Sequence, residues 1–190
     1  MADSTLSRFS KVATDPLRNF RFLVNFVNNV DGAPLNSKIQ SFSGGFSNVG
    51  GLGINIQNIS YREGGMNTTL HQVPGQASFN PITLQRGTIW KKDEAVTWMK
   101  ALFAAAAGEG INGGGSNFRC NLEIYVLDHP VTSSNTNDTI AASSYRMKFT
   151  VHNAWITSLS YNDLSAQGNE ILYENITLIH EGISFDLNPA

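Results

Sequence analysis

Apolar and polar residues alternate along several short stretches of the chain. In the stretch 19–27 every even position is phenylalanine or valine, and the stretch 145–151 alternates in the same way. A period of two is typical of a β-strand with one buried face. We therefore predict strands in both stretches and expect the even face of the first, Phe20 to Phe26, to pack into the core. Further strands are predicted at 39–49, 54–61, 78–85, 120–126, 155–161 and 171–180.

The predicted strand 54–61 changes parity halfway. Ile54 and Ile56 lie at even positions, whereas Ile59 and Tyr61 lie at odd ones. A β-bulge inserts one residue and reverses which face the later side chains occupy. We therefore predict a bulge near Asn58 that brings both halves to one face.

One stretch has helical spacing. Asp93 can cap the first turn, and Gly108 lies where a helix would stop. Between them the apolar residues recur three and four positions apart, which predicts one substantial helix with its apolar stripe on the sheet. The stripe comprises Ala95, Val96, Met99, Leu102, Phe103 and Ala106.

These elements define the fold class as mainly β with one α-helix, an antiparallel β-sandwich or barrel-like fold. The chain has 190 residues with 41% hydrophobic residues, enough for a core in one domain over 1–190. We treat 1–15 as an N-terminal arm. Glycine fills much of 108–117, and polar residues fill 129–142, so both are predicted to be extended loops.

The charge of the chain is low and nearly balanced. Charged residues make up 15% of the sequence and the net charge is -2, against about 25% charged residues in a typical domain. A protein that binds nucleic acid directly needs a basic surface, which this composition does not supply. A net charge near zero also gives little mutual repulsion between copies, which weakly favours self-association.

Cys120 is the single cysteine, so no disulfide can form within the chain, and we expect a buried thiol in a strand. The segment 1–16 lacks the basic and apolar regions of a secretory signal. No stretch reaches the roughly 20 apolar residues of a membrane span. A membrane anchor is therefore not expected.

Two motif matches fail on their context. The run Gly108 to Gly113 has the letters of a dinucleotide-binding loop, but that loop must follow a strand and open a helix, whereas this run follows the predicted helix. His180-Glu181 begins like a zinc-protease motif, yet Ser184 stands where the second histidine is required. No cofactor or metal site is predicted.

Catalytic and sugar-binding readings remain as remote alternatives. Glu170, Glu174 and Glu181 could supply the carboxylate pair of a small β-sandwich hydrolase, but no G-x-S-x-G nucleophile elbow is present. Trp90, Trp98 or Trp155 could serve a carbohydrate-binding module, although tryptophans in a helix or at a strand junction more often pack in a core. No catalytic residue is predicted.

Seven short blocks, in order from Asp15 to Gly182, resemble the contractile-tail tube protein family, which includes phage tail tubes and the inner tubes of contractile injection systems. Both predicted loops look longer than in compact members of that family. The blocks are Asp15 to Phe22, Phe46 to Gly53, Tyr61 to Gly65, His71 to Gly75, Leu84 to Gly87, Asn153 to Trp155, and Asn169-Glu170 leading to His180-Glu181-Gly182.

The resemblance implies a non-enzymatic structural subunit of the inner tube of a contractile phage tail. Such subunits form hexameric rings that stack inside a sheath, and strands of neighbouring subunits join into one barrel around a lumen. The implied partners are further copies of the chain, the sheath, the baseplate, the tail terminator and the tape-measure protein. DNA or protein cargo would pass without sequence-specific binding. The implied location is the virion tail, assembled in the host cytoplasm.

The resemblance also suggests which residues lie at subunit contacts: Tyr61, Arg62, Glu63 and Glu181. In an extended strand Arg62 and Glu63 would point to opposite faces and need different partners. Two variants of the function stay open. The chain could form the inner tube of a cell-encoded injection system, or it could be a tube-like adaptor or terminator that does not polymerise.

Overall fold

The computed structural model describes Leu17 and the ranges 19–27, 45–65, 68–89, 91–108, 118–127 and 145–187. The predicted N-terminal arm, Trp90 and nearly all of both predicted loops lie outside these residues. The elements are β1 (Phe22–Val27), β2 (Phe46–Gly50), β3 (Ile54–Tyr61), β4 (His71–Phe79), β5 (Ile82–Gly87), α3 (Glu94–Ala106), β6 (Cys120–Leu127), β7 (Tyr145–Tyr161), β8 (Tyr173–Ile179) and β9 (Gly182–Leu187).

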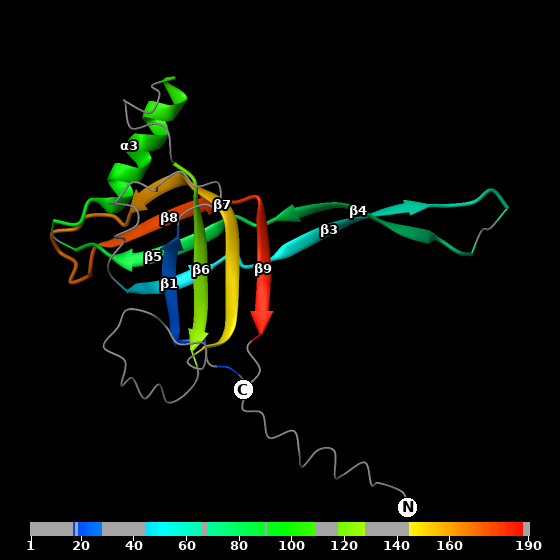
Figure 1. The fold of residues 1–190 in the computed structure, drawn as a ribbon, viewed down its shortest axis with the longest axis horizontal. Helices are drawn as coiled ribbons and strands as arrows, with labels where there is room; N and C mark the ends of the chain where they lie inside the picture. Colours follow the sequence, from blue (N-terminus) through cyan, green and yellow to red (C-terminus); the bar gives the residue numbers. More distant parts are fainter. Residues whose placement is uncertain are drawn as a thin grey trace, which may run out of the picture.

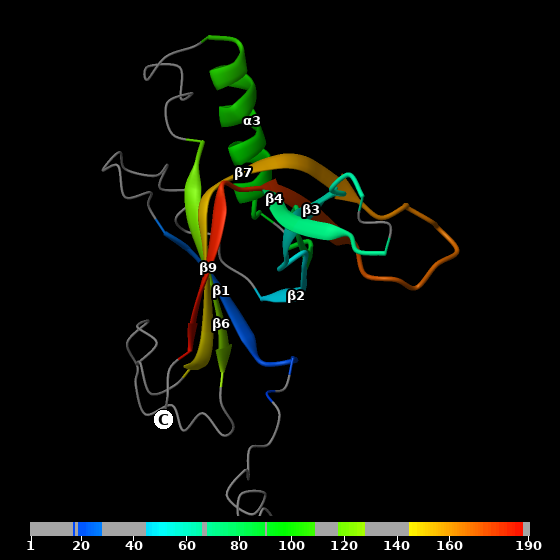
Figure 2. The ribbon, with the colours of Figure 1, turned by 90° about the vertical axis from the view of Figure 1, so that its right-hand side faces the viewer.

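Strand β7 joins two layers of antiparallel strands. Its first part pairs with β6 and β9, and its second part pairs with β8. One layer therefore has the order β1-β6-β7-β9 and the other the order β7-β8-β5-β2, with β7 curving from one to the other (Figure 2). The predicted α+β sandwich is confirmed, and its sheets are not closed into a barrel. The two strands predicted over 145–161 form one strand of 17 residues.

The core lies between these two layers. It follows from the alternation along the strands, because every second residue of a strand points to the same face. Phe26 is buried in β1, whereas Phe20, predicted to share its face, lies before the strand and is 63% exposed. Cys120 is buried in β6, as predicted. The other fully buried apolar side chains of the strands include Ile82, Leu84, Leu122, Ile124, Val151, Ile156, Ile176 and Leu178.

Helix α3 forms where its spacing predicted it, between Asp93 and Gly108. Ala95 of the predicted stripe is buried and Met99 and Leu102 pack against the core, but the buried face is turned toward Trp98. Trp98 is fully buried, its indole N–H donates to the carbonyl oxygen of Phe118 at 2.6 Å, and its ring meets Phe26 edge to face. Phe103, part of the predicted stripe, is 66% exposed. The predicted stripe is wrong in this respect, because the indole brings the larger apolar surface and finds an acceptor for its N–H.

Strands β3 and β4 form a separate two-stranded sheet, which we call the arm. Figure 1 shows the arm extending from the body beyond the β9 side. Asn80 and Pro81 separate β4 from β5, so the single strand predicted at 78–85 is wrong: proline cannot donate a ladder hydrogen bond. Strand β9 was not predicted.

Candidate subunit-contact surfaces

Three of the four predicted contact residues lie at the distal end of the arm. Tyr61 is the last residue of β3, and its ring stacks on His71 with centroids 5.2 Å apart. Arg62 and Glu63 follow the strand and are exposed, before a turn in which Gly65 has a φ of 97°. The predicted opposite orientation of Arg62 and Glu63 stays a prediction, because both residues lie just beyond the end of β3.

Glu181 lies on the body, away from these three residues. One carboxylate oxygen accepts a hydrogen bond from Arg119 at 2.7 Å, and the other accepts one from the side-chain amide of Asn153, also at 2.7 Å. Asn153 has a φ of 53° in β7, a conformation that asparagine tolerates better than most residues. Two of the recognised blocks thus meet here, at the corner of β7.

The arm exposes apolar side chains along its length. Ile56 is 63% exposed and Ile59 is 58% exposed, and Val73 opposite Ile59 is also exposed. The register shift lies near Asn58, as predicted, but two residues of β4 oppose Gln57 alone, so the extra residue is on β4. Alternation along β3 therefore continues, and its two apolar halves lie on opposite faces. The predicted gathering of these halves on one face is wrong.

The base of the arm is fixed by close backbone contacts. Gly51 has a φ of 85°, and a Cβ there would lie 2.0 Å from the carbonyl oxygen of Pro81. Asn55 donates to the side-chain oxygen of Asn80 at 2.8 Å. His180 lies against the Asn80 carbonyl through Nε2 at 3.1 Å and against the Gly182 carbonyl through Nδ1 at 3.0 Å. These contacts hold both strands of the arm where they leave the body.

The layer β1-β6-β7-β9 ends in two strands with one open edge each. Within the described residues, β1 pairs only with β6, and β9 pairs only with β7. An unpaired edge offers N–H and C=O groups to another chain. The face of this layer away from the core is largely polar, with Asn25, Glu123, Thr150 and Ser184 in neighbouring register positions and Leu23 as an exposed apolar member.

A small charged group lies on that polar face. Lys148 forms an ion pair with Glu123, and the Tyr125 hydroxyl donates to Glu123 at 2.6 Å. Burial acts to raise the pKa of Glu123, but the hydrogen bonds from Lys148 and Tyr125 outweigh it, so its pKa lies below the ordinary value. Burial and the neighbouring carboxylate raise the pKa of Tyr125. The face therefore carries charges that largely neutralise one another.

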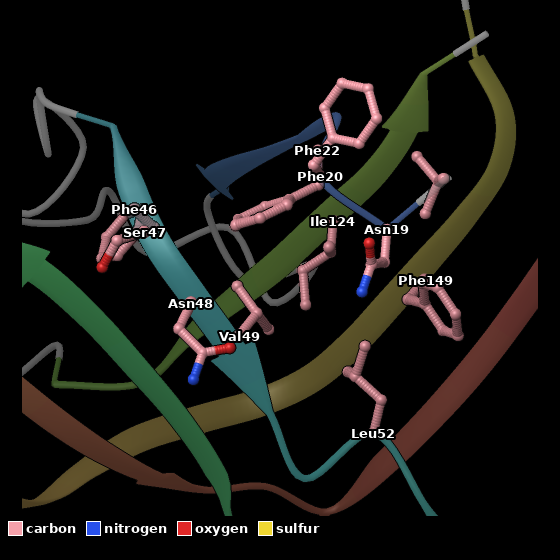
Figure 3. Close-up of a pocket in the computed structure, with 11 residues that line it drawn as sticks. Asn19, Phe20, Phe22, Phe46, Ser47, Asn48, Val49, Leu52, Ile124 and Phe149 are labelled. Atoms are coloured by element: carbon pink, nitrogen blue, oxygen red, sulfur yellow. The ribbon is translucent and has the colours of Figure 1, made fainter. Parts of the chain in front are cut away.

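An apolar groove opens between β1 and β2, where the two layers separate. It holds about 570 Å³. Figure 3 shows Val49 and Leu52 pointing toward Ile124 and Phe149, with Phe20 at one side. Phe22, Phe46 and Val126 complete its apolar lining, and Asn19, Ser47 and Asn48 are polar members.

A buried ion cluster ties the helix to the second layer. Arg86 is 2% exposed and bonds to Glu174 at 2.6 Å and to Glu94 at 3.3 Å. Tyr161 donates to Glu174 at 3.1 Å, and burial followed by this carboxylate raises the pKa of Tyr161. Sequence reasoning missed this role. The pattern that could have indicated it is the alternation of the strand: the charged residue lies on the same face as Ile82 and Leu84, two apolar positions of the same strand.

The remaining chemical candidates are used in packing or lie apart. Among the described residues no group of three or more His, Cys, Asp and Glu side chains could hold a metal ion, and no described helix is long and apolar enough to span a membrane. Glu174 is buried in the ion cluster, while Glu170 is exposed. Trp155 meets Phe118 edge to face.

The exposed arm, the groove and the open strand edges are the surfaces on which the described residues leave apolar side chains or backbone groups accessible. The family model described as T4-like virus tail tube protein gp19 matches residues 18–184. The chain belongs to this tail tube family. A search of curated proteins found no match.

Three solved structures share the fold. A chain of the anti-feeding prophage baseplate has a TM-score of 0.69 at 20% identity, over 93% of this chain and 99% of that one. A chain of the anti-feeding prophage tube-terminating cap has a TM-score of 0.65 at 23% identity, over 93% and 94%. A chain of the PVC sheath–tube complex, an extracellular contractile injection system, has a TM-score of 0.60 at 24% identity, over 98% and 99%.

Proposed function

We propose that this chain is the structural subunit of the inner tube of a contractile phage tail, forming hexameric rings that stack around a lumen. The observation that carries the proposal is the strand order β1-β6-β7-β9, which leaves an open edge at each end among the residues that the structure describes. Each neighbouring pair is antiparallel. Strand β9 of one copy is therefore antiparallel to β1 of the next copy in the same orientation. Ring closure would pair both edges of this layer and remove one template for aggregation.

The polar face of this layer would line the lumen. The opposite face is apolar and packs on the second layer, so only the polar face can meet water throughout the ring. The Glu123–Lys148 pair leaves little net charge there. DNA or protein cargo would then pass without sequence-specific binding, because neither a continuous basic stripe nor an apolar patch retains it.

The solved relatives support the choice of partners. Their names place them in a baseplate, a terminating cap and a sheath–tube complex. For this chain we propose contacts with further copies of itself, a sheath, a baseplate, a terminator and a tape-measure protein. Its location would be the virion tail, after assembly in the host cytoplasm as one domain over 1–190.

A second candidate is the tube of a cell-encoded injection system, and a third is a non-polymerising adaptor or terminator. The cell-encoded tube is favoured by similarity to the PVC sheath–tube complex, and the adaptor or terminator by similarity to the anti-feeding prophage cap. Tube length separates the adaptor from the two tube candidates, since an adaptor makes a ring that does not stack. In each case the role is structural rather than enzymatic.

The deciding experiment is negative-stain electron microscopy of the purified protein, with sedimentation velocity on the same sample. Hollow sixfold rings or tubes are the expected result. A strict monomer, even on addition of a preformed baseplate, would contradict the proposal. Isolated rings at every concentration would favour the adaptor.

The predicted contact residues have their own test. We propose that Tyr61, Arg62 and Glu63 at the arm tip, and Glu181 at the corner of β7, lie at or near subunit contacts. Arg62→Glu reverses a charge that is exposed in the separate chain, and it is expected to weaken ring and tube formation without lowering the melting temperature. Unchanged assembly would show that Arg62 makes no important contact.

A further inference from the structure

Helix α3 and the groove lie at opposite ends of the body. Trp98 of α3 contacts Phe26, near the end of β1, and bonds to Phe118, just before β6. The groove lies toward the other end of the same two strands, where Phe22 of β1 is paired with Val126 of β6. Figures 1 and 2 both show α3 rising away from the two layers at the first of these ends. The body therefore has a protrusion at one end and a recess toward the other.

The free end of α3 leaves apolar surface in solvent. Phe103 is 66% exposed, and Ala106 and the C-cap Ala107 are also exposed. The helix carries no charged side chain from residue 101 to its end. Its first turn, by contrast, is anchored, because Glu94 is buried beside Arg86. The free end is therefore an apolar ridge whose position is fixed from the body.

The groove has the complementary chemistry. None of the described residues that line it is charged, and most of them are apolar. Its volume of about 570 Å³ lies within the roughly 300–1,000 Å³ of pockets that enclose whole ligands. A helix that lays apolar side chains into a hydrophobic groove is a recurring mode of recognition. Figure 3 shows Val49, Ile124 and Phe149 around the space that such a helix would fill.

The partial charges of the two surfaces also match. The last turn of a helix leaves backbone carbonyl groups without partners inside the helix, and the aligned peptide dipoles make this end partly negative. No basic residue lies in the last turn of α3. Asn19 and Asn48 of the groove carry side-chain amide N–H groups, which can donate hydrogen bonds to such carbonyls. The groove therefore suits the end of α3 in polarity as well as in apolar surface.

We propose that the free end of α3 of each copy inserts into the groove of a copy in the adjacent ring. The inference rests on the proposed function. Hydrogen bonds between strands run perpendicular to them, so pairing of β9 with the next β1 closes a ring sideways and turns the two ends of the strands toward the neighbouring rings. A head-to-tail contact between unlike surfaces can then repeat along the tube. The occupant of the groove is a second copy of this chain.

Cross-linking between rings tests the contact directly. The double variant Ala107→Cys with Asn48→Cys places one thiol at the end of α3 and another at the groove, at two exposed positions. Native Cys120 is buried in β6 and stays unreactive. Treatment of assembled tubes with a short bismaleimide is expected to give a ladder of covalent species that continues past six chains, because each link joins one ring to the next.

The matched control carries Gln167→Cys in place of Ala107→Cys, because Gln167 is also exposed but lies between β7 and β8. It should give no ladder. Tubes seen by microscopy without a ladder from the first variant would overturn the proposal and leave the proposed function standing. A ladder that ends at six chains would also overturn it, since the link would then lie within one ring. Failure of the unmodified protein to form tubes would count against the proposed function instead.

An added charge separates stacking from ring formation. Phe103→Glu is expected to raise the protein concentration needed for stacking by about tenfold or more, while sedimentation velocity still shows single rings. Phe103→Glu with Asn48→Lys is expected to restore much of the loss, because the two new charges are opposite. Leu164→Glu is the control, since Leu164 is 86% exposed between β7 and β8. Equal weakening by the control, loss of the single rings, or no recovery in the double variant would contradict the contact.

Discussion

Arg86 is a charged residue in the interior, held by two carboxylates on different elements. Its bonds to Glu174 and Glu94 connect β5, β8 and the first turn of α3. Removing one partner of such a pair leaves a buried charge without compensation. The arginine therefore belongs to the packing of the body, even though the sequence block that contains it was recognised only as a family motif.

The consequence for stability can be measured. Arg86→Met is expected to lower the free energy of unfolding by about 3–5 kcal/mol, since both carboxylates lose their buried cation. Lys92→Met is the control, because the Lys92 side chain is 42% exposed beside the same Glu94 and such pairs contribute about 0–1 kcal/mol. Urea unfolding compares the two variants. Similar losses in the free energy of unfolding for both variants would show that the buried ion cluster contributes no more than the exposed Lys92 pair.

Glu123 gives the body a dependence on pH. Its pKa in the folded chain lies below its ordinary value of 4.5, through the hydrogen bonds from Lys148 and Tyr125 that outweigh burial. A depressed carboxyl pKa contributes stability above the ordinary value, and this stability is lost as the pH falls through the folded pKa. Glu123→Gln should therefore destabilise the protein at about pH 7 more than at about pH 3.

Urea unfolding of both proteins at these two pH values checks this prediction. Asp163→Asn is a suitable control, because Asp163 is an exposed carboxylate beyond the end of β7, away from Lys148. The expected result is a smaller difference between the two pH values for Glu123→Gln than for the control. An equal pH dependence in both variants would contradict the role of Glu123.

At the scale of elements, the direction of the arm depends on its base. Gly51→Ala is expected to cost about 1–3 kcal/mol, because alanine disfavours the φ of 85° and its Cβ would lie 2.0 Å from the Pro81 carbonyl oxygen. Gly64→Ala is the matched control, since a Cβ at Gly64 meets nothing within 4 Å. Thermal melting distinguishes the two variants, and equal melting temperatures would refute this account of the base.

At the scale of the whole molecule, the arm is a separate sheet outside the core of the body. The arm contributes no residue to the buried core, so its removal should spare folding and abolish assembly. Ile56 and Ala77 face one another in the ladder, and an Asn-Gly turn can join two such positions. We expect this shortened chain to melt close to the full chain and to sediment as a monomer. Rings from the shortened chain would show that the arm is dispensable.

Much of the fold could be predicted from local pattern. The alternation of 19–27 and 145–151 and the helical spacing after Asp93 determine elements because side-chain periodicity reports which face is buried. Arg86 shares a strand face with apolar neighbours, and this alternation could have indicated that its side chain is buried. The contact candidates Tyr61, Arg62 and Glu63 came from resemblance, and nothing in the residue pattern indicated that they lie on the arm while Glu181 lies on the body.

The sequence by itself determined a mainly β domain with one helix, a buried cysteine and membership of the tail tube family, because periodicity and ordered motifs are local properties. Only the tertiary structure decided that Trp98 rather than Phe103 is buried on α3, that β7 runs unbroken through both layers, and that β3 and β4 leave the body as an arm. Each of these depends on which surfaces meet across long sequence separations. A single strand cannot encode its partner, and the pairing that leaves β1 and β9 as open edges emerges only when all the strands compete for partners at once.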